Sequence, residues 1–423
     1  MHYRIPKGVF DILPHDPEEG WRFSHLWQYL EKVIRDLANQ YGFREIRTPL
    51  FETTELFQRG IGTTTDIVTK EMYTFDDLGK RSMTLRPEGT APVMRAFIEK
   101  HLEAQAPVHK FFYIGPMFRY ERQQQGRYRQ HHQFGIEAIG NSSFYQDVEV
   151  IELLYALYTR LGLKNLNLHI NSLGDTEARK KFRHALKMYL NPHFAELSEE
   201  SQNRYETNPL RILDSKDPGD QKLLEKAPSI LDFLDEAEKT HFSKVLDVLE
   251  KVGIPYEVNP KLVRGLDYYN NTVFEITTGD LGAQNSVGGG GRYDGLMKQL
   301  GGPDLPAFGF GTGLERIIQT CLTQQVQLPT PFRTDLLFIP LGDEAASLCF
   351  QELSRLRKQG FAIEMDFSGK KLKRAMQYAN SSQVRHVAIV GENEIKEGRF
   401  ALKEMESGHE EMLSFAQLEK RLR

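Results

Sequence analysis

The sequence predicts an α+β domain built on an antiparallel sheet, with a helical insertion, followed by a smaller α/β domain. Two long aromatic and β-branched runs, residues 109–121 and 130–140, flank a polar arm and indicate a long antiparallel hairpin. Between about 175 and 240, helical patterns alternate with polar stretches, which predicts the insertion. Beyond residue 335, strand and helix patterns alternate and predict a compact three-layer α/β domain. We therefore expect domains at 1–325 and 335–423, joined by a proline-containing linker at 326–334.

The composition excludes several classes of protein. The chain has 423 residues, with 54 Lys and Arg against 58 Asp and Glu, a net charge of −4. This balance argues against a protein that coats nucleic acid by bulk charge. No uncharged run approaches the roughly 18 residues that span a bilayer, so no membrane segment is expected. Only 2 cysteines are present, which favours a reducing compartment and a cytoplasmic location.

The elements expected in the first part of the chain follow from hydrophobic periodicity. Apolar residues three and four apart predict a helix over 16–40, and the next apolar run predicts a strand over 45–51. This strand contains Pro49, which cannot donate to a sheet, so it is expected at an edge or an interface. A strand at 83–86 and a helix over 87–99 come next.

The later elements follow the same patterns. Before the linker we expect helices at 147–161 and 313–322 and strands at 166–170, 256–258 and 272–277. After it we expect strands at 335–340, 362–366, 387–391 and 400–405 and helices at 344–359, 372–381 and from 414 onward.

The predicted hairpin supplies the first chemical indication. Residues two apart share one face of a strand, so Arg119 and Glu121 point the same way, as do Gln133 and Glu137. With strict alternation His131 shares the face of Gln133 and Glu137. A face of this composition suits a polar ligand, although a solvated sheet face with ion pairs explains it equally well.

The arm between the two runs is basic. It holds Arg122, Arg127 and Arg129 among three glutamines, with Tyr128. Arginine offers a planar fork of donors that suits phosphates, and glutamine can read base edges. The arm favours nucleic-acid or nucleotide binding, with a charged exposed loop as the alternative.

Residues 85–90 place Glu88, Gly89 and Thr90 at a strand-to-helix junction. Backbone can approach a small ligand closely beside a glycine, and the Glu88 carboxylate could hold an ammonium group. The alternative is that Glu88 caps the helix that follows.

Three further segments combine glycine, arginine and tyrosine. Arg264, Tyr268 and Tyr269 lie on an expected turn, although tyrosine pairs are more often core residues. The four glycines at 288–291 precede Tyr293 and would weaken a strand unless something must approach its backbone. A glycine-rich strand at 309–313 leads to Arg316, which can reach phosphate oxygens. None of these segments matches a phosphate-binding P-loop or a dinucleotide fingerprint.

In this order the segments resemble the class II aminoacyl-tRNA synthetases, and among them the histidyl-tRNA synthetase family. YGFREIRTPLFE, FRYERQQQGRYRQHHQFGIE and PAFGFGTGLERI resemble the three class motifs. RPEGTA, LVRGLDYYNNTVFE and GGGGRYDGL are more specific, and the last two resemble motifs peculiar to the histidine enzymes.

The resemblance implies a histidine–tRNA ligase. Its antiparallel sheet would bind ATP and L-histidine, form histidyl-adenylate and pyrophosphate, and pass histidine to the 3′ end of tRNA(His). It also implies a C-terminal anticodon-binding domain, a homodimer formed through the first motif, and Mg²⁺ accompanying ATP without a metal site made of protein ligands. The alternative is a non-catalytic relative that serves as the regulatory subunit of ATP phosphoribosyltransferase. Such relatives typically lack a domain like 335–423.

The resemblance also implies roles for individual residues. Arg119 would hold the α-phosphate, Glu121 the adenine amino group and Arg316 the γ-phosphate, while Arg264 would stabilise charge developing at the α-phosphate. Arg119 and Arg264 are thus the expected catalytic residues. The residues expected around histidine are Glu88, Gly89, Thr90, Gln133, Glu137, Arg264, Tyr268, Tyr269 and Tyr293, with Glu137 and Tyr269 pairing with the imidazole nitrogens. Those expected to contact tRNA are Arg122, Arg127, Arg129, Lys370 and Lys371.

Overall fold

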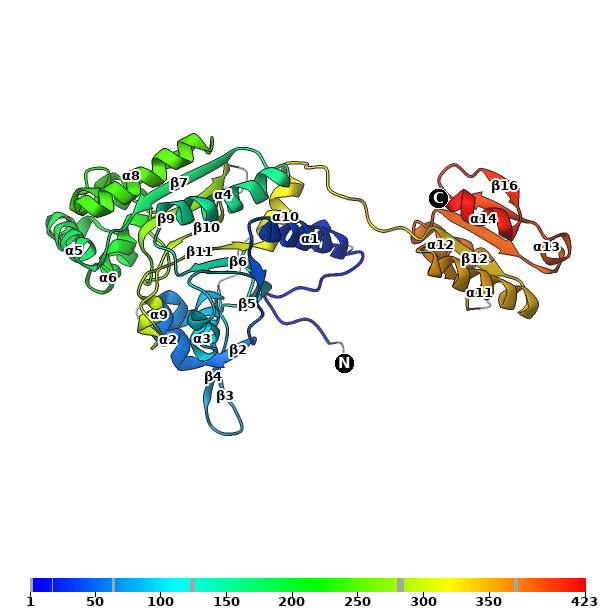
Figure 1. Ribbon diagram of the computed structural model, residues 1–423, viewed down its shortest axis with the longest axis horizontal. Coiled ribbons are helices and arrows are strands. Elements are labelled where there is room, and N and C mark those ends of the chain that lie inside the picture. The colour runs from blue at the N-terminus through cyan, green and yellow to red at the C-terminus, as the bar shows by residue number, and fades with distance from the viewer. Residues whose placement is uncertain (1–2, 17, 63–64, 122–125, 280–284, 369–371) are drawn as a thin grey trace. The chain divides into compact units, whose positions relative to one another are not determined.

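The computed structural model describes residues 3–16, 18–62, 65–121, 126–279, 285–368 and 372–423. Among the predicted site residues, Arg122, Lys370 and Lys371 lie outside these ranges. The chain forms two compact units, Met1–Pro329 and Thr330–Arg423 (Figure 1). No helix within the described ranges is both long and apolar enough to cross a membrane.

An eight-stranded sheet forms the centre of the first unit. Its order is β1-β5-β6-β11-β10-β9-β7-β8, and only the outer pairs β1/β5 and β7/β8 are parallel. The predicted hairpin is confirmed as the pair β5 and β6. The strands are β1 Arg44–Glu45, β5 His109–Phe118, β6 Gln130–Ile139, β7 Leu166–Ser172, β8 Tyr256–Val258, β9 Asn270–Thr278, β10 Ser286–Arg292 and β11 Ala307–Gly313.

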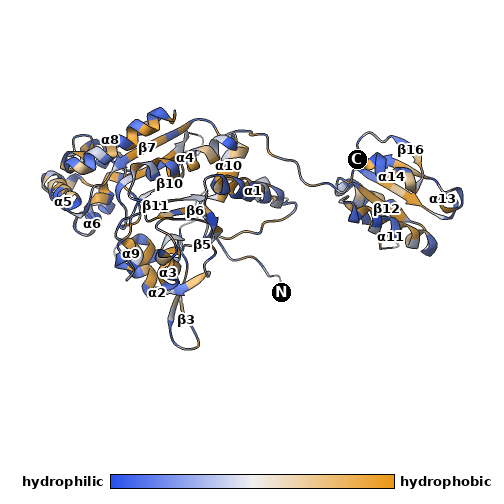
Figure 2. Cartoon of the chain, in the orientation of Figure 1, coloured by the Kyte–Doolittle hydropathy of each residue, from blue (hydrophilic) through white to orange (hydrophobic). Residues whose placement is uncertain are grey.

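One face of this sheet is densely packed against helices. Phe134, Ile136 and Ala138 alternate along β6, and all three are fully buried in one apolar cluster. Burying a side chain of the size of phenylalanine or isoleucine contributes about 1.5–3 kcal/mol. Figure 2 shows apolar residues gathered along the strands. The covering helices are α1 Ser24–Gln40, α4 Phe144–Arg160, α8 Glu236–Lys251 and α10 Leu314–Thr323.

The opposite face carries the intervening residues of each strand. It is bordered by α3 Thr90–Glu99, by the short α9 Leu296–Gln299 and by the helical insertion, all of which share a second apolar cluster with it. The insertion contains α5 Thr176–Leu190, α6 Glu199–Thr207 and α7 Pro218–Leu224 with 3₁₀ turns between them. The helix α8 follows them and contacts α4.

A three-stranded sheet lies apart from the main one. Its order is β2-β4-β3, formed by Phe51–Thr53, Ser82–Leu85 and Tyr73–Asp76. The helix α2 Thr54–Ile61 follows β2, and a π-helical turn spans Ile67–Glu71. Neither α2 nor β3 was expected from the sequence.

The single strand predicted at 45–51 is wrong. The segment divides into β1, at the edge of the large sheet, and β2, at the edge of the small one. Between them the carbonyl oxygens of Thr48 and Pro49 accept hydrogen bonds from the buried Arg86 guanidinium, at 3.1 and 3.5 Å. These oxygens are satisfied by a side chain, so the backbone leaves the ladder.

Two predicted helices begin later than expected. The helix predicted from residue 16 begins at Ser24, because the Asp16 carboxylate accepts from the backbone N–H groups of Glu18 and Glu19 at 2.8 Å and holds a turn. The helix predicted from residue 87 begins at Thr90. Glu88 accepts from its first backbone N–H groups.

The second unit has the predicted three layers. Its sheet has the order β13-β12-β14-β15-β16. Leu336 and Phe338 of β12 face α11 and α14, whereas Leu337 and Ile339 face α12 on the other side. The elements are β12 Leu336–Pro340, α11 Asp343–Lys358, β13 Ile363–Met365, α12 Leu372–Ser381, β14 His386–Val390, α13 Glu392–Glu397, β15 Phe400–Glu404, β16 Glu410–Leu413 and α14 Phe415–Leu422. The short elements α13 and β16 were not expected.

A buried ion pair joins the sheet to its helices. The fully buried Asp147 of α4 accepts from Nε of Arg292 at 3.2 Å and from its Nη2, and from Nε2 of His241 on α8 at 2.9 Å. Arg292 ends β10 and is 1% exposed. The pair therefore fixes the strand end that carries Tyr293.

We predict that Asp147→Ala lowers the free energy of unfolding by about 3–5 kcal/mol, because the buried Arg292 would lose its main ionic partner and keep only Asp294, at 3.3 Å. Chemical denaturation followed by tryptophan fluorescence measures this, since both tryptophans, Trp21 and Trp27, are buried in the first unit. Asp36→Ala is the control, because Asp36 pairs with Lys32 on the surface and should contribute less than about 1 kcal/mol. Equal effects of the two changes would contradict the prediction.

Candidate active site

The open face of the large sheet has a floor of glycine. In register across three strands lie Gly135, Gly311 and Gly289, and the next row is Glu137, Gly309 and Gly291. A Cβ on Gly311 would overlap the Gln133 amide, and one on Gly309 would overlap the Glu137 carboxylate. These glycines therefore leave space that polar side chains of β6 occupy.

Glu137 lies at the centre of this face and is 1% exposed. Its Oε1 accepts from Thr90 Oγ1 at 2.8 Å and from the Tyr113 hydroxyl at 3.3 Å, and its Oε2 accepts from the Tyr293 hydroxyl. Burial raises the pKa of Glu137 to about 8, against the effect of these hydrogen bonds. The carboxyl group is thus held in one orientation by three hydroxyl groups.

Three tyrosines form a wall beside Glu137. The ring centroids of Tyr268 and Tyr269 are 4.7 Å apart, and those of Tyr268 and Tyr293 are 5.6 Å apart. All three are buried, and burial raises their pKa values. The three rings and Glu137 bring together residues that are far apart in the sequence.

Glu88 and Gly89 have clear structural roles. The Glu88 oxygens accept from the backbone N–H groups of Thr90 and Ala91 at 2.6 and 2.9 Å, so the capping alternative describes its geometry. Burial raises the pKa of Glu88. Gly89 is needed because a Cβ there would overlap the ring of Tyr113.

Arg119 and Glu121 lie just beyond the end of β5, which stops at Phe118, so the expected strand is shorter than predicted. Arg119 Nε donates to the Pro87 carbonyl oxygen at 2.8 Å, and its Nη1 is 4.0 Å from Glu121. Arg127 lies 3.3 Å from the other Glu121 oxygen. His131 is on the same face, and burial together with Arg119 lowers its pKa to about 3, so it is neutral near pH 7.

A row of hydrogen bonds connects the two remaining arginines. Arg264 Nη1 donates to Glu275 Oε1 at 2.9 Å, and Ser286 Oγ donates to the same oxygen at 2.7 Å. Arg316 Nη1 then donates to the Ser286 carbonyl oxygen at 2.6 Å. The sheet thereby places both guanidinium groups along β9 and β10, near the glycine floor.

Two buried polar atoms of this face have no hydrogen-bond partner within the described part of the chain, Gln133 Oε1 and Arg264 Nε. Buried polar groups are nearly always hydrogen-bonded. An acceptor and a donor are therefore available to a ligand above the glycine floor. Within the described ranges, no group of three or more His, Cys, Asp or Glu side chains is arranged to hold a metal ion.

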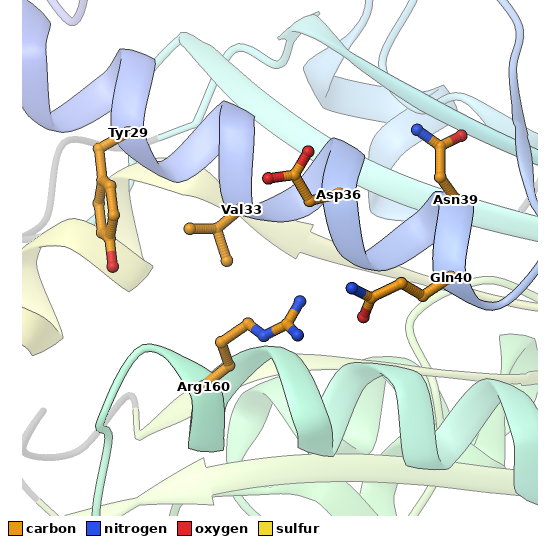
Figure 3. A pocket seen from close by; sticks show the side chains of 6 residues that line it. All are labelled: Tyr29, Val33, Asp36, Asn39, Gln40 and Arg160. Carbon is orange, nitrogen blue, oxygen red and sulfur yellow. The ribbon is translucent and has the colours of Figure 1, made fainter.

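Arg129 lies outside this arrangement. Its guanidinium carbon is 3.8 Å from the ring centroid of Tyr120, and its stem packs against Gly8. A separate surface groove of about 470 Å³ lies between α1 and α4, lined by Tyr29, Val33, Asp36, Asn39, Gln40 and Arg160 (Figure 3). It includes none of the predicted site residues.

Sequence reasoning missed two residues of the site. Tyr113 pairs with Gly135 across the hairpin and therefore shares the face of Gln133 and Glu137. The alternation that selected those two residues could have found it. Glu275 orients Arg264, but nothing in the run TVFEIT distinguishes it from an ordinary exposed strand residue.

Three features together define a class II aminoacyl-tRNA synthetase. They are an antiparallel sheet with arginines and a buried carboxylate above a glycine floor, a helical insertion, and a separate α/β unit. The model of the family described as Histidyl-tRNA synthetase matches residues 9–317, and that of the Anticodon binding domain matches residues 335–423. The chain belongs to the histidyl-tRNA synthetase family.

Relatives match over nearly the whole chain. A Histidine--tRNA ligase of Protochlamydia amoebophila is 60% identical over 99% of both chains. A Histidine--tRNA ligase of Chlamydia trachomatis is 49% identical over 96% of this chain and 94% of its own. The crystal structure of an apo histidyl-tRNA synthetase of S. aureus is 36% identical over 100% of both chains, with a TM-score of 0.82.

We predict that Glu137 makes the first unit less stable as the pH rises. Its folded pKa of about 8 lies above the ordinary 4.5, so the folded state keeps a proton that the unfolded chain releases. The resulting contribution is complete below pH 4.5 and is lost as the pH rises through 8. Thermal midpoints should be measured at pH 5, 6.5 and 8. As the pH rises, the midpoint of Glu137→Gln should increase steadily relative to that of the wild type.

The matched control for this prediction is Glu225→Gln, a change at an exposed carboxylate of the same unit. Its midpoints should follow those of the wild type at every pH. A constant difference between Glu137→Gln and the wild type would contradict the raised pKa.

Proposed function

We propose that the pocket formed by Glu137, the tyrosine wall and Arg264 selects L-histidine and activates it with ATP. As a member of its family the chain has the activity of a histidine–tRNA ligase, EC 6.1.1.21. It uses ATP as a substrate and charges tRNA(His). One observation supports this pocket above others: a buried carboxyl group ringed by hydroxyl groups lies on the glycine-lined face that Arg264 approaches. Arg119 directly follows β5, and Arg316 donates to the Ser286 carbonyl oxygen at the start of β10.

Glu137 and Tyr269 suit the two nitrogens of imidazole. One ring nitrogen carries a proton and the other accepts one, so a carboxylate and a phenol can each pair with one of them. A side chain without these nitrogens would leave buried polar groups unpaired, and sites of this kind discriminate by about 10⁴–10⁵. Tyr268 and Tyr293 would pack against the ring, and Thr90, Gly89, Glu88 and Gln133 would lie nearest the ammonium and carboxylate groups.

Activation requires positive charge around the phosphates. A carboxylate oxygen of histidine attacks the α-phosphorus of ATP, and the bond to the pyrophosphate oxygen breaks. Arg119 would hold the α-phosphate and Arg316 the γ-phosphate, while Arg264 would stabilise charge at the α-phosphate. Such pre-positioned donors lower the barrier because they need no reorganisation during the reaction. Glu121 would accept from the adenine amino group, and Mg²⁺ would arrive with the phosphates of ATP.

Transfer is the second step. A hydroxyl group at the 3′ end of tRNA attacks the histidyl carbonyl carbon, and AMP leaves with the electron pair of the broken bond. Residues 1–325 would provide this chemistry, the insertion at about 175–240 included, and 335–423 would bind the anticodon beyond a linker at 326–334. Arg127 and Arg129, with Arg122, Lys370 and Lys371 outside the described residues, remain our candidates for contacts with tRNA phosphates.

We further propose that the chain works as a homodimer in the cytoplasm. Leu50 and Phe51 within the first motif and Phe75 on the neighbouring hairpin are 45%, 50% and 45% exposed. Apolar side chains gathered at the edge of a sheet are typical of an interface. A monomeric mass in sedimentation equilibrium would refute the dimer.

The alternative function, a regulatory subunit of ATP phosphoribosyltransferase, is not supported, because the curated relatives that match over 94–99% of their lengths are ligases.

We predict histidine-dependent exchange of pyrophosphate into ATP, slowed strongly by Arg264→His. Adenylate formation should fall by about 10²-fold or more, the effect of removing one transition-state donor, while histidine affinity changes far less. Steady-state exchange and calorimetric histidine binding separate the two effects. Arg183→His, at an exposed position on α5, is the control. Equal loss of binding and rate would contradict the role assigned to Arg264.

We predict that a chain ending at Pro329 retains pyrophosphate exchange but charges tRNA poorly. The first unit has its own core up to that residue, so the chemistry of activation should persist without the second unit. The KM for tRNA should rise by at least tenfold in aminoacylation assays, because contacts with the anticodon would be lost. Undiminished charging would show that the second unit does not contribute to tRNA binding.

A further inference from the structure

The segment that carries Tyr268 and Tyr269 is held from outside the sheet. It leads from Arg264 to the start of β9, and its backbone oxygens point toward the helical insertion. The Tyr269 carbonyl oxygen accepts from Arg179 Nη1 at 2.9 Å, and the Asp267 carbonyl oxygen lies 3.4 Å from the same nitrogen. Two peptide groups next to the tyrosine wall are thus fixed by one side chain.

Arg179 belongs to α5, the first helix of the insertion. Its Nε donates to the Asp175 carbonyl oxygen at the start of that helix, at 3.3 Å. The guanidinium group therefore bridges the helix N-terminus and the Asp267–Tyr269 backbone. A planar fork with donors on two sides can make both contacts at once, which an ammonium group on a flexible stem does less well.

A second residue of the insertion forms a hydrogen bond with the same segment. Asn208, between α6 and the next 3₁₀ turn, donates from Nδ2 to Asp267 Oδ1 at 3.0 Å. Asp267 is also confined on its other side, because a Cβ on Gly62 would lie 2.8 Å from its Oδ2. The segment is therefore enclosed between α2 and the insertion.

The start of the insertion is tied to the same place. Asn271 N–H donates to the Gly174 carbonyl oxygen at 3.0 Å, and Leu173 N–H donates to the Asn271 carbonyl oxygen at 2.7 Å. Residues 173–174 lead directly into α5. A shift of α5 relative to the sheet would consequently be transmitted to Tyr269 through both Arg179 and this backbone pair.

We propose that Arg179 and Asn208 are positioning residues for histidine recognition, and that the insertion sets the position of the Tyr269 hydroxyl relative to Glu137. Neither residue touches the reacting atoms. Their effect is on the distance between two groups that must meet the two imidazole nitrogens together. This inference rests on the proposed role of Tyr269, and the experiment below distinguishes a failure of either one.

The test compares full-length Arg179→Met, Asn208→Ala and Tyr269→Phe in pyrophosphate exchange and in calorimetric binding of histidine. Arg179→Met should raise both the KM and the Kd for histidine by roughly tenfold, the loss expected for hydrogen bonds from a charged donor. The KM for ATP should change less than twofold. Arg179→Lys should recover part of the affinity, because an ammonium group can still donate to the Tyr269 carbonyl oxygen.

Arg183→Met is the matched control, since Arg183 lies one turn further along α5 and is exposed. It should leave both substrates unaffected. If Arg179→Met lowers the thermal midpoint by more than a few degrees, Asn208→Ala tests the same segment through an uncharged contact and should raise the Kd for histidine alone.

The outcomes distinguish the positioning role of Arg179 and Asn208 from the assignment of the histidine pocket. If Tyr269→Phe weakens histidine binding while Arg179→Met and Asn208→Ala do not, the positioning role is wrong and the pocket assignment stands. If the Arg179 change weakens ATP and histidine equally, its role is general stability and the proposal is overturned. If Tyr269→Phe itself has no effect on histidine, the pocket is wrongly assigned and the positioning role falls with it.

Discussion

Glycine on one face of the large sheet is the constraint on which the site depends. A sheet of this size would ordinarily cover both faces with side chains, and the face toward α1, α4, α8 and α10 is covered in this way. On the other face Gly289, Gly309 and Gly311 leave the backbone bare. Because a Cβ there would overlap Glu137 or Gln133 or press on Arg264, the polar residues exist in their positions only because their neighbours across the strands have no side chain. Glycine within a strand lowers stability, and the burial of apolar side chains on the packed face offsets this loss.

A second consequence of this arrangement is that the buried acid and the arginines occupy different parts of the face. Within the described part of the chain, the hydrogen-bond partners of Glu137 are hydroxyl groups, and burial raises its pKa to about 8. Arg264 and Arg316 lie further along β9 and β10, where Glu275 and the Ser286 backbone hold them. The face is thus divided into a region of hydroxyl groups and one acid, suited to a small aromatic base, and a region of guanidinium groups, suited to phosphates. We propose that this separation serves the two substrates of one reaction, histidine and ATP.

The helical insertion contacts the segment of the tyrosine wall in two ways. Apolar residues of α5 and the tyrosine wall share one cluster, and Arg179 adds a polar contact with a defined direction. An apolar contact resists separation but allows sliding, whereas a hydrogen bond to a carbonyl oxygen fixes a position. The insertion can therefore act on the pocket without contributing a side chain to it.

The sequence by itself determined the order of the motifs, the hairpin, the three-layer second unit and the family. These follow from periodicity, alternation and local composition, which depend on neighbours in the chain. It also indicated that the four glycines at 288–291 serve a close approach. The tertiary structure alone decided that Glu88 caps α3, where the strand with Pro49 breaks, and that Tyr113 donates to Glu137 and Arg179 to the Tyr269 carbonyl oxygen. The physical reason is that each of these outcomes depends on a hydrogen-bond partner or an open space whose position only the folded chain defines, such as Glu137 for Tyr113, 24 positions away, and the Tyr269 carbonyl for Arg179, 90 positions away.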